Sequence, residues 1–125
     1  QDVRRDLLEL DRIYIPRSER DLDDADLRRL ASGTGSADER ARFERILRPL
    51  VERTDAMMIS ATKLPKLVDP SIARPVLLFQ RAGLLVGRRI RRERFATLWA
   101  RPRVPRLSLV CMACSAMLRP VGTAA

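Results

Sequence analysis

The stretch QDVRRDLLELDRIYIP, residues 1–16, decides how the rest of the chain is interpreted. Val3, Leu7 and Leu10 recur at the spacing of one apolar stripe on an α-helix. The residues just before Pro16 should be extended, because a proline pushes the residue ahead of it out of the helical backbone conformation. The stretch therefore predicts a short helix that ends near Leu10 and an extended segment after it.

Two carboxylates stand one helical turn apart on this predicted helix, Asp2 and Asp6. Like charges at this spacing repel by about 0.2–0.5 kcal/mol in an isolated helix, so a partner must compensate them. Arg5 lies three residues after Asp2 and four before Glu9, which would make an ordinary solvated ladder of charges. Alternatively, the pair points into a cavity and binds Mg²⁺, a hard ion that prefers carboxylate oxygens. The spacing leaves both interpretations open.

The composition indicates a helical protein of one domain. The chain has 125 residues, which is enough for a single hydrophobic core. Apolar residues make up 46% of it and aromatic residues only 4%, and Leu, Ala, Val and Ile dominate. This composition suits helices better than sheets, so we expect an all-α fold.

Charge is distributed unevenly along the chain. Residues 1–62 hold 12 basic and 14 acidic side chains, whereas residues 63–125 hold 13 basic and 2 acidic ones. The second half should therefore face an anionic partner, which could be nucleic acid, a lipid surface or a diphosphate. The basic stretch RRIRRERF, residues 88–95, lacks the interleaved aromatic residues and binding motifs of nucleic-acid proteins. It indicates a solvated helix end or a flank that rests on an anionic membrane surface.

Cys111 and Cys114 form the chain's single CxxC motif. Because the sequence has no His and no other Cys, a zinc site here would need ligands from elsewhere. A packed helix face in a reducing cytoplasm is the better interpretation. The apolar runs fall short of the roughly 20 residues that a membrane-spanning helix needs. We therefore expect a cytoplasmic protein.

Capping residues and prolines predict the remaining helices. The stretch at residues 21–33 should bury Leu22, Leu27 and Leu30 and end at Gly33. Ser36 and Glu39 have the spacing of a capping box. The apolar stripe that follows consists of Phe43, Ile46, Leu47, Leu50, Val51, Met57, Met58 and Ala61, and Pro49 should kink or divide that helix. Asp69 and Pro70 predict the start of a long helix through residues 75–95, and a last helix should occupy residues 106–118.

The first sixteen residues resemble the second aspartate-rich motif of the squalene/phytoene synthase family. That motif is a DxxxD on a helix, a short spacer and an Arg-x-Tyr-x-Pro element, which match Asp2, Asp6, Arg12, Tyr14 and Pro16. The similarity continues through residues 63–86 and 95–110 and covers essentially the whole chain. It implies the C-terminal helices of an isoprenoid-synthase-type helical bundle, with residues 1–125 forming one partial domain that lacks the N-terminal helices. Such a chain should not turn over substrate alone.

The resemblance implies a prenyltransferase that joins two farnesyl or geranylgeranyl diphosphates head to head. The reaction passes through a cyclopropyl diphosphate toward squalene, hydroxysqualene or phytoene-type products, and Mg²⁺ helps the diphosphate to leave. If the roles of the family's motif residues apply at the matching positions, Asp2 and Asp6 would be metal ligands, and Tyr14 and Arg12 would be catalytic. Arg12 and Arg101 would bind the substrate diphosphate, although Arg103 or Arg106 could fill the place of Arg101.

Several positions depart from the family pattern. Gln1 and Arg5 stand where the family commonly has an arginine and an acidic residue, and Ala82 and Gly83 lie near the place of a cavity-facing aromatic residue. The resemblance leaves the product branch, the prenyl chain length, the use of NADPH and the oligomeric state open. The Gln-Asp start favours the branch that hydrolyses the cyclopropyl intermediate to an alcohol.

A second interpretation comes from the charge alone. The chain could be a small basic helical binding module that docks on RNA or a larger complex. That interpretation requires the acidic pair to be solvated and the arginines of residues 88–106 to gather on one exposed face. The prenyl synthase interpretation instead requires Asp2 and Asp6 to point into an apolar cavity near Tyr14, and it needs no nucleic-acid partner.

Overall fold

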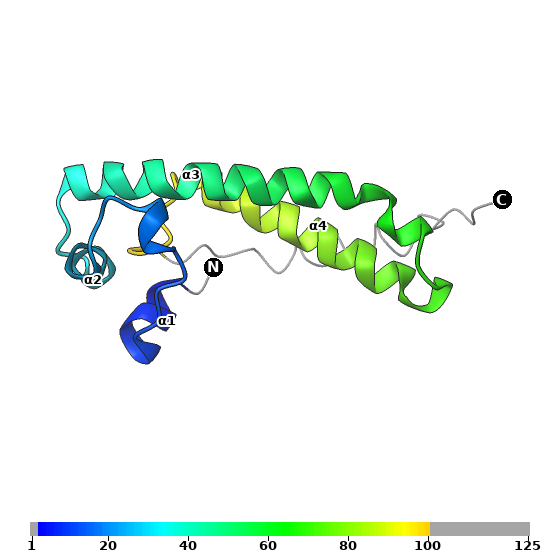
Figure 1. The fold of residues 1–125 in the computed structure, drawn as a ribbon, viewed down its shortest axis with the longest axis horizontal. Helices are drawn as coiled ribbons and strands as arrows, with labels where there is room; N and C mark the ends of the chain where they lie inside the picture. Colours follow the sequence, from blue (N-terminus) through cyan, green and yellow to red (C-terminus); the bar gives the residue numbers. More distant parts are fainter. Residues whose placement is uncertain (1–2, 101–125) are drawn as a thin grey trace. The chain divides into compact units, whose positions relative to one another are not determined.

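The computed structural model describes residues 3–100, and all regular elements within that range are helical (Figure 1). They are α1 (Val3–Leu10), η1 (Arg17–Glu19), α2 (Asp24–Ser32), α3 (Ala37–Ser60), η2 (Ala61–Lys66) and α4 (Pro70–Arg92). This confirms the all-α fold. The predicted helix at 106–118 lies outside the described residues. Among the described helices none is long and apolar enough to cross a membrane.

The described residues form two compact units, one of residues 3–51 with 89–100 and one of residues 52–88.

In the first unit, α1 ends at Leu10 because Asp11 adopts a left-handed backbone conformation with φ of 51°. The N–H of Arg12 then donates to the carbonyl of Asp6 at 2.9 Å, which closes the helix end. Leu7 is buried as the apolar stripe predicted, but Leu10 is half exposed. The expected burial of Leu10 fails because the chain leaves the helix there. Residues 11–16 are non-helical, as expected.

The second helix, α2, is fixed at both ends. The N–H of Asp26 donates to Asp23 Oδ1 at 2.7 Å, and the N–H of Asp23 donates to Asp26 Oδ2 at 3.0 Å, which makes a capping box. Gly33 has φ of 89°, the left-handed conformation that favours glycine, and it ends α2 as predicted. The leucines predicted to be buried are buried: Leu22, Leu27 and Leu30.

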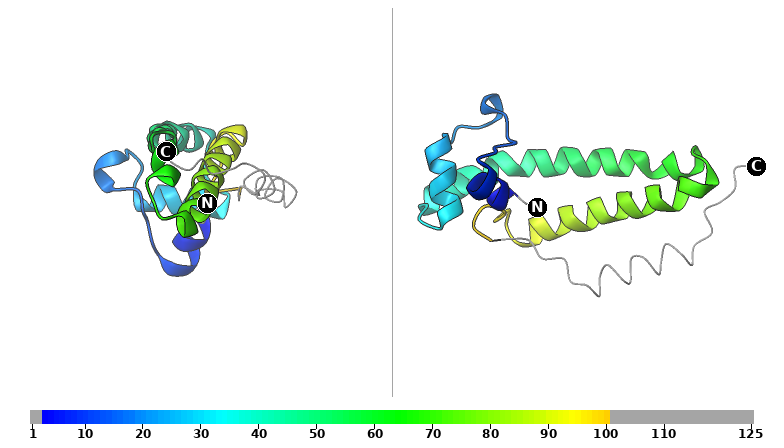
Figure 2. Two further views of the ribbon diagram at one scale, coloured as in Figure 1. Left: turned by 90° about the vertical axis from the view of Figure 1, so that its right-hand side faces the viewer. Right: turned by 90° about the horizontal axis from the view of Figure 1, so that it is seen from below.

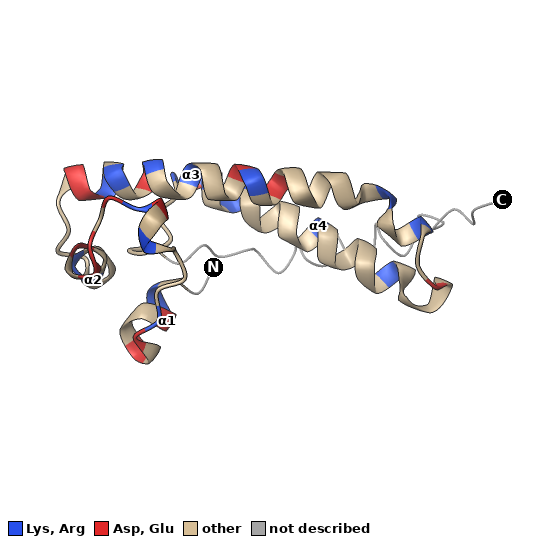
Figure 3. Cartoon of the chain, viewed as in Figure 1, with Lys and Arg blue, Asp and Glu red and all other residues tan. Residues whose placement is uncertain are grey.

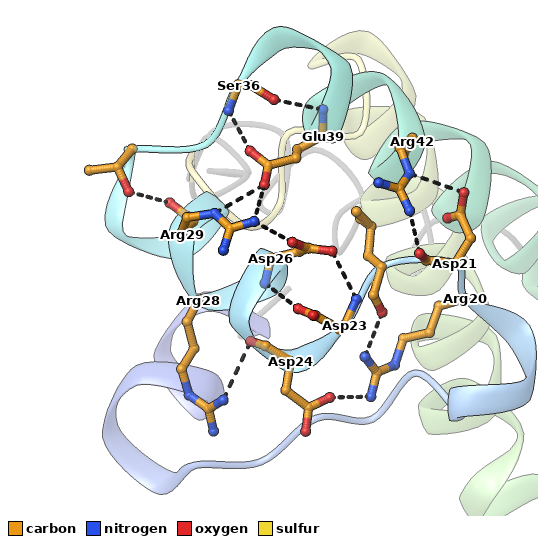
Figure 4. A network of polar contacts seen from close by, with 12 residues as sticks. Arg20, Asp21, Asp23, Asp24, Asp26, Arg28, Arg29, Ser36, Glu39 and Arg42 are labelled. Carbon is orange, nitrogen blue, oxygen red and sulfur yellow. Dashed lines mark hydrogen bonds and ion pairs between the residues drawn. The ribbon is translucent and has the colours of Figure 1, made fainter.

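The predicted capping box at the start of α3 is confirmed. The N–H of Glu39 donates to Ser36 Oγ at 3.1 Å, and the N–H of Ser36 donates to Glu39 Oε2 at 2.6 Å. Glu39 also pairs with Arg29 of α2 and joins a network of charged side chains around α2 (Figure 4). The Ser36 N–H and the Arg29 guanidinium together lower the pKa of Glu39 to about 2.

Pro49 does not divide α3, which runs unbroken from Ala37 to Ser60. A proline inside a helix removes one backbone hydrogen bond, but the turns on either side remain bonded. Buried side chains precede and follow Pro49, among them Leu47 and Val51, and their packing stabilises the helix on both sides of the proline.

The helix α4 ends earlier than the sequence predicted, at Arg92 rather than near Phe95. Arg94 and Phe95 adopt left-handed conformations with φ of 50° and 59°, which reverse the chain. The reversal buries Phe95 and Leu98 in the core of the first unit. There Arg48 lies over the Phe95 ring, with its guanidinium carbon 4.7 Å from the ring centroid.

In the second unit, the end of α3 and the larger part of α4 run antiparallel, side by side (Figure 2). Ala73, Gln80 and Gly87 are buried at seven-residue intervals, which places them on one face of α4. Gln80 Nε2 donates to the carbonyl of Met58 at 2.6 Å and to Thr62 Oγ1 at 3.1 Å. Met57, which the stripe predicted to be buried, is exposed instead, because Met58 turns toward α4.

Candidate functional site

Two of the predicted site residues lie on the segment between α1 and η1. Side chains of an extended segment alternate in direction. Ile15 is buried and Ile13 half-buried, whereas Arg12 and Tyr14 are exposed, Tyr14 at 62% of its surface. The isoleucines therefore anchor the segment while Arg12 and Tyr14 face outward together.

A small hollow lies beside this segment in the first unit. Its empty space of about 220 Å³ includes open solvent, so the hollow is a shallow depression rather than an enclosed cavity. Its lining is apolar except for one guanidinium and one phenol: Val3, Leu7, Arg12, Ile13, Tyr14, Ile15, Leu27, Phe43 and Leu98. Ligand pockets usually enclose about 300–1,000 Å³, whereas the enclosed part of this hollow has room for little more than a water molecule, so a ligand would lie against it rather than inside it.

Asp6 of α1 is buried, with 9% of its surface exposed, rather than solvated. Arg5 Nε and Nη2 donate to Asp6 Oδ1 at 3.2 and 3.0 Å. The other oxygen, Oδ2, accepts no hydrogen bond from residues 3–100. Asp6 does not line the hollow, although its neighbour Leu7 does.

The carboxylate of Asp6 fits a magnesium ligand in its chemistry, since Oδ2 accepts no hydrogen bond from residues 3–100 and Arg5 holds the side chain in place. The predicted second ligand, Asp2, lies outside the described residues. Within residues 3–100 no group of three or more His, Cys, Asp or Glu side chains could hold a metal ion. The metal-ligand roles of Asp2 and Asp6 stay predictions.

Arg12 differs from most arginines of the first unit in having no partner. Its guanidinium forms no hydrogen bond or ion pair with residues 3–100. By contrast, Arg20 pairs with Asp24 at 2.6 Å and Arg4 donates to the carbonyl of Ala31 at 2.9 Å. An exposed, unpaired guanidinium at the edge of an apolar hollow is available to an anion such as a diphosphate. The other predicted diphosphate partner, Arg101, lies outside the described residues.

Sequence reasoning missed two features of this site. It did not predict the hydrogen bonds that Arg5 donates to the carboxylate of its neighbour Asp6. It also missed Leu98, which reaches the hollow only through the backbone reversal after α4. The alternation of Ile13 and Ile15 with polar neighbours was a visible signal for the wall of the hollow. No local pattern marks Leu98.

Comparison with known families decides between the two interpretations of the sequence. The family model of squalene/phytoene synthase matches residues 1–108. The chain belongs to the squalene/phytoene synthase family. Searches of curated proteins and of solved structures found no match. The family indicates a prenyltransferase-type enzyme of isoprenoid biosynthesis, and it favours that function over a basic helical binding module.

Proposed function

We propose that this squalene/phytoene synthase family chain supplies part of the diphosphate site of a head-to-head prenyl synthase. The substrates are two prenyl diphosphates, farnesyl or geranylgeranyl, which condense through a cyclopropyl diphosphate. One observation supports the proposal most directly. The unpaired guanidinium of Arg12 and the exposed ring of Tyr14 both lie at the edge of the same apolar hollow. An allylic diphosphate has the same two parts, an anionic head and an apolar chain.

Arg12 is proposed to bind the diphosphate. A guanidinium presents two parallel N–H donors that match two phosphate oxygens, and it stays charged throughout the reaction. The backbone bond from the Arg12 N–H to the Asp6 carbonyl fixes the start of the side chain next to α1.

Tyr14 is proposed to face the reacting end of the chain. The face of its ring attracts positive charge, so it can stabilise an allylic cation as the diphosphate leaves, while its hydroxyl can reach a diphosphate oxygen. The apolar walls of the hollow, among them Leu7 and Phe43, would lie against the prenyl chain.

Asp2 and Asp6 are proposed to hold Mg²⁺. When bound, the metal neutralises the diphosphate and makes it a better leaving group. Arg5 keeps the Asp6 carboxylate in one orientation with Oδ2 open, which prepares it for the ion. Product formation by hydrolysis of the cyclopropyl intermediate is the branch that we favour, and this branch requires no nicotinamide cofactor.

Binding of a non-hydrolysable farnesyl diphosphate analogue, with and without Mg²⁺, tests the proposal. We expect Mg²⁺ to tighten binding, and we expect the Asp2→Ala, Asp6→Ala double variant to lose about tenfold or more in affinity. Asp38→Ala, which removes an exposed carboxylate at the start of α3, is the control and should bind as the wild type does. Binding that is unchanged by removal of Mg²⁺ and by the double substitution would contradict the proposal. Asp2 and Asp6 would then be part of a solvated charge ladder, and the basic binding module would be the better interpretation.

A further inference from the structure

The segment that carries Arg12 and Tyr14 leaves α1 through a single residue, Asp11. Asp11 has φ of 51°, and this left-handed conformation brings Cβ close to a carbonyl oxygen, a cost that glycine does not have. Burial does not compensate the cost, because 75% of the Asp11 side chain is exposed. The conformation therefore depends on contacts of other kinds.

Two such contacts are present at the turn. The N–H of Arg12 donates to the carbonyl of Asp6 at 2.9 Å, which joins the turn to the helix that it ends. The carboxylate of Asp11 pairs with the guanidinium of Arg28 on α2, whose Nη2 donates to Asp11 Oδ1. Within residues 3–100 no other ion pair involves residues 11–16. The ion pair is thus the charged contact that ties the turn to α2.

Arg28 is itself oriented by α2. Its Nη1 also donates to the carbonyl of Asp24, one helical turn earlier, at 3.4 Å (Figure 4). The residue before it, Leu27, is buried and lines the hollow. Two neighbouring residues of α2 therefore contribute to the site in different ways. Leu27 forms part of the wall, and Arg28 holds the turn from which Arg12 projects.

The packing of α1 on α2 does not depend on this ion pair. Arg4 Nε donates to the carbonyl of Ala31 at the end of α2, at 2.9 Å, and Leu7 of α1 is buried. Charged positions of both signs occur throughout α1, α2 and the segment between them (Figure 3). Loss of the pair between Asp11 and Arg28 should therefore loosen the turn and leave the two helices packed.

We propose that Arg28 is a positioning residue for the diphosphate site. By pairing with Asp11 it keeps the left-handed turn formed, and the turn keeps the guanidinium of Arg12 at the edge of the hollow. Arg28 needs no contact with the ligand for this role. The inference rests on the proposed function and adds that α2 controls how often Arg12 is in place. The affinity for a ligand falls in proportion to the fraction of molecules that are ready to bind it.

Hydrogen exchange of the Arg12 amide, followed by NMR in the ligand-free full chain, tests the turn itself. We expect Arg28→Gln and Asp11→Ala to speed this exchange by about twofold to fivefold, the range of an exposed ion pair. The double variant Arg28→Gln, Asp11→Gly lacks the same ion pair. It should exchange as slowly as the wild type, because glycine adopts the left-handed conformation without the cost of a Cβ.

Titration of the same variants with the farnesyl diphosphate analogue in Mg²⁺, and with farnesol, tests the effect on the ligand. Arg28→Gln and Asp11→Ala should bind the diphosphate about twofold to fivefold more weakly, and the glycine double variant should bind it as the wild type does. Farnesol binding should stay the same, since Ile13 and Ile15 remain packed in the unit. A merely structural role for Arg28 would lower both affinities together.

Arg42→Gln is the matched control. It removes another arginine of the first unit that forms an ion pair on the surface, with Asp21 at 3.1 Å, and that pair does not involve residues 11–16. Both the exchange of the Arg12 amide and the binding of the diphosphate should be the same as in the wild type.

Two results would overturn this inference alone. One is an Arg12 amide that exchanges equally slowly in Arg28→Gln. The other is diphosphate binding that Arg12→Gln weakens while Arg28→Gln does not, or that the glycine substitution fails to restore. A wild-type chain that does not bind the diphosphate would overturn the proposed function and this inference with it.

Discussion

At the scale of single residues, most arginines of the first unit contribute to its structure. Arg20 and Arg42 pair with carboxylates next to or within α2, and Arg29 joins α2 to the capping box of α3 (Figure 4). Arg12 is exposed beside the hollow and has no such partner in the part of the chain that the structure describes. Arg17 and Arg45 also form no hydrogen bond or ion pair with residues 3–100, but Arg12 alone among them lines the hollow, which is why we propose it for the diphosphate.

Glu39 gives a prediction for the stability of the first unit at low pH. Its folded pKa, about 2, lies below the ordinary value of 4.5, because the Ser36 N–H and Arg29 favour the charged form. A depressed pKa means that its stabilising contribution is complete above about pH 4.5 and is lost as the pH falls toward 2.

Thermal unfolding of the wild type and Glu39→Gln across pH 2–6 measures this contribution. We expect the variant to unfold at a lower temperature near pH 6 and the difference in Tm to shrink as the pH approaches 2. A difference in Tm that stays constant over the whole range contradicts the assigned pKa. Asp38→Asn, one residue earlier on α3, is the matched control.

The residue types of the candidate site could be read from the sequence, but their surroundings could not. The spacing of Arg12, Tyr14 and Pro16 follows a family motif, and the alternation with Ile13 and Ile15 follows from an extended backbone. The bond from Arg5 to Asp6 depends on which way a flexible side chain turns in the folded unit. Spacing predicts which side chains can meet, and packing decides which of them do.

At the scale of elements, caps were predictable and long-range packing was not. Ser36 with Glu39, Gly33, and Asp69 with Pro70 each fix a helix end through local bonds, so local sequence is enough to find them. The end of α4 depends instead on positive φ at Arg94 and Phe95. Non-glycine residues adopt that conformation only where surrounding contacts compensate its cost, here the burial of Phe95.

Two glycines of α4 give a prediction for the second unit. A Cβ added at Gly87 would lie 2.4 Å from Oδ1 of the buried Asp55, whereas one added at Gly83 would lie 3.1 Å from the flexible end of Met58. Alanine is favoured over glycine in a helix by up to about 1 kcal/mol. We therefore expect Gly83→Ala to be neutral or stabilising, and Gly87→Ala to destabilise by about 1–3 kcal/mol.

Urea unfolding of the two variants, followed by circular dichroism, measures the difference. Both substitutions add one methyl group to the same helix, so each serves as the control for the other. Equal stabilities would mean that α3 and α4 do not approach each other at Gly87 as closely as the structure shows.

At the scale of the whole molecule, the family match covers residues 1–108. Two of the motif residues that suggested the family, Arg12 and Tyr14, line an apolar hollow in the structure, whereas Asp6 does not. The central claim is that Arg12 binds a diphosphate there. That claim concerns one guanidinium and one class of ligand, so it can be tested on the chain itself.

The most direct test compares Arg12→Gln with Arg17→Gln, an exposed arginine five residues further along that does not line the hollow. Each variant and the wild type are titrated with the farnesyl diphosphate analogue in Mg²⁺, and then with farnesol, which lacks the diphosphate. The account predicts that Arg12→Gln alone weakens binding of the diphosphate, by about tenfold to a hundredfold, and leaves farnesol binding unchanged. Equal affinities of all three proteins for the diphosphate would contradict it.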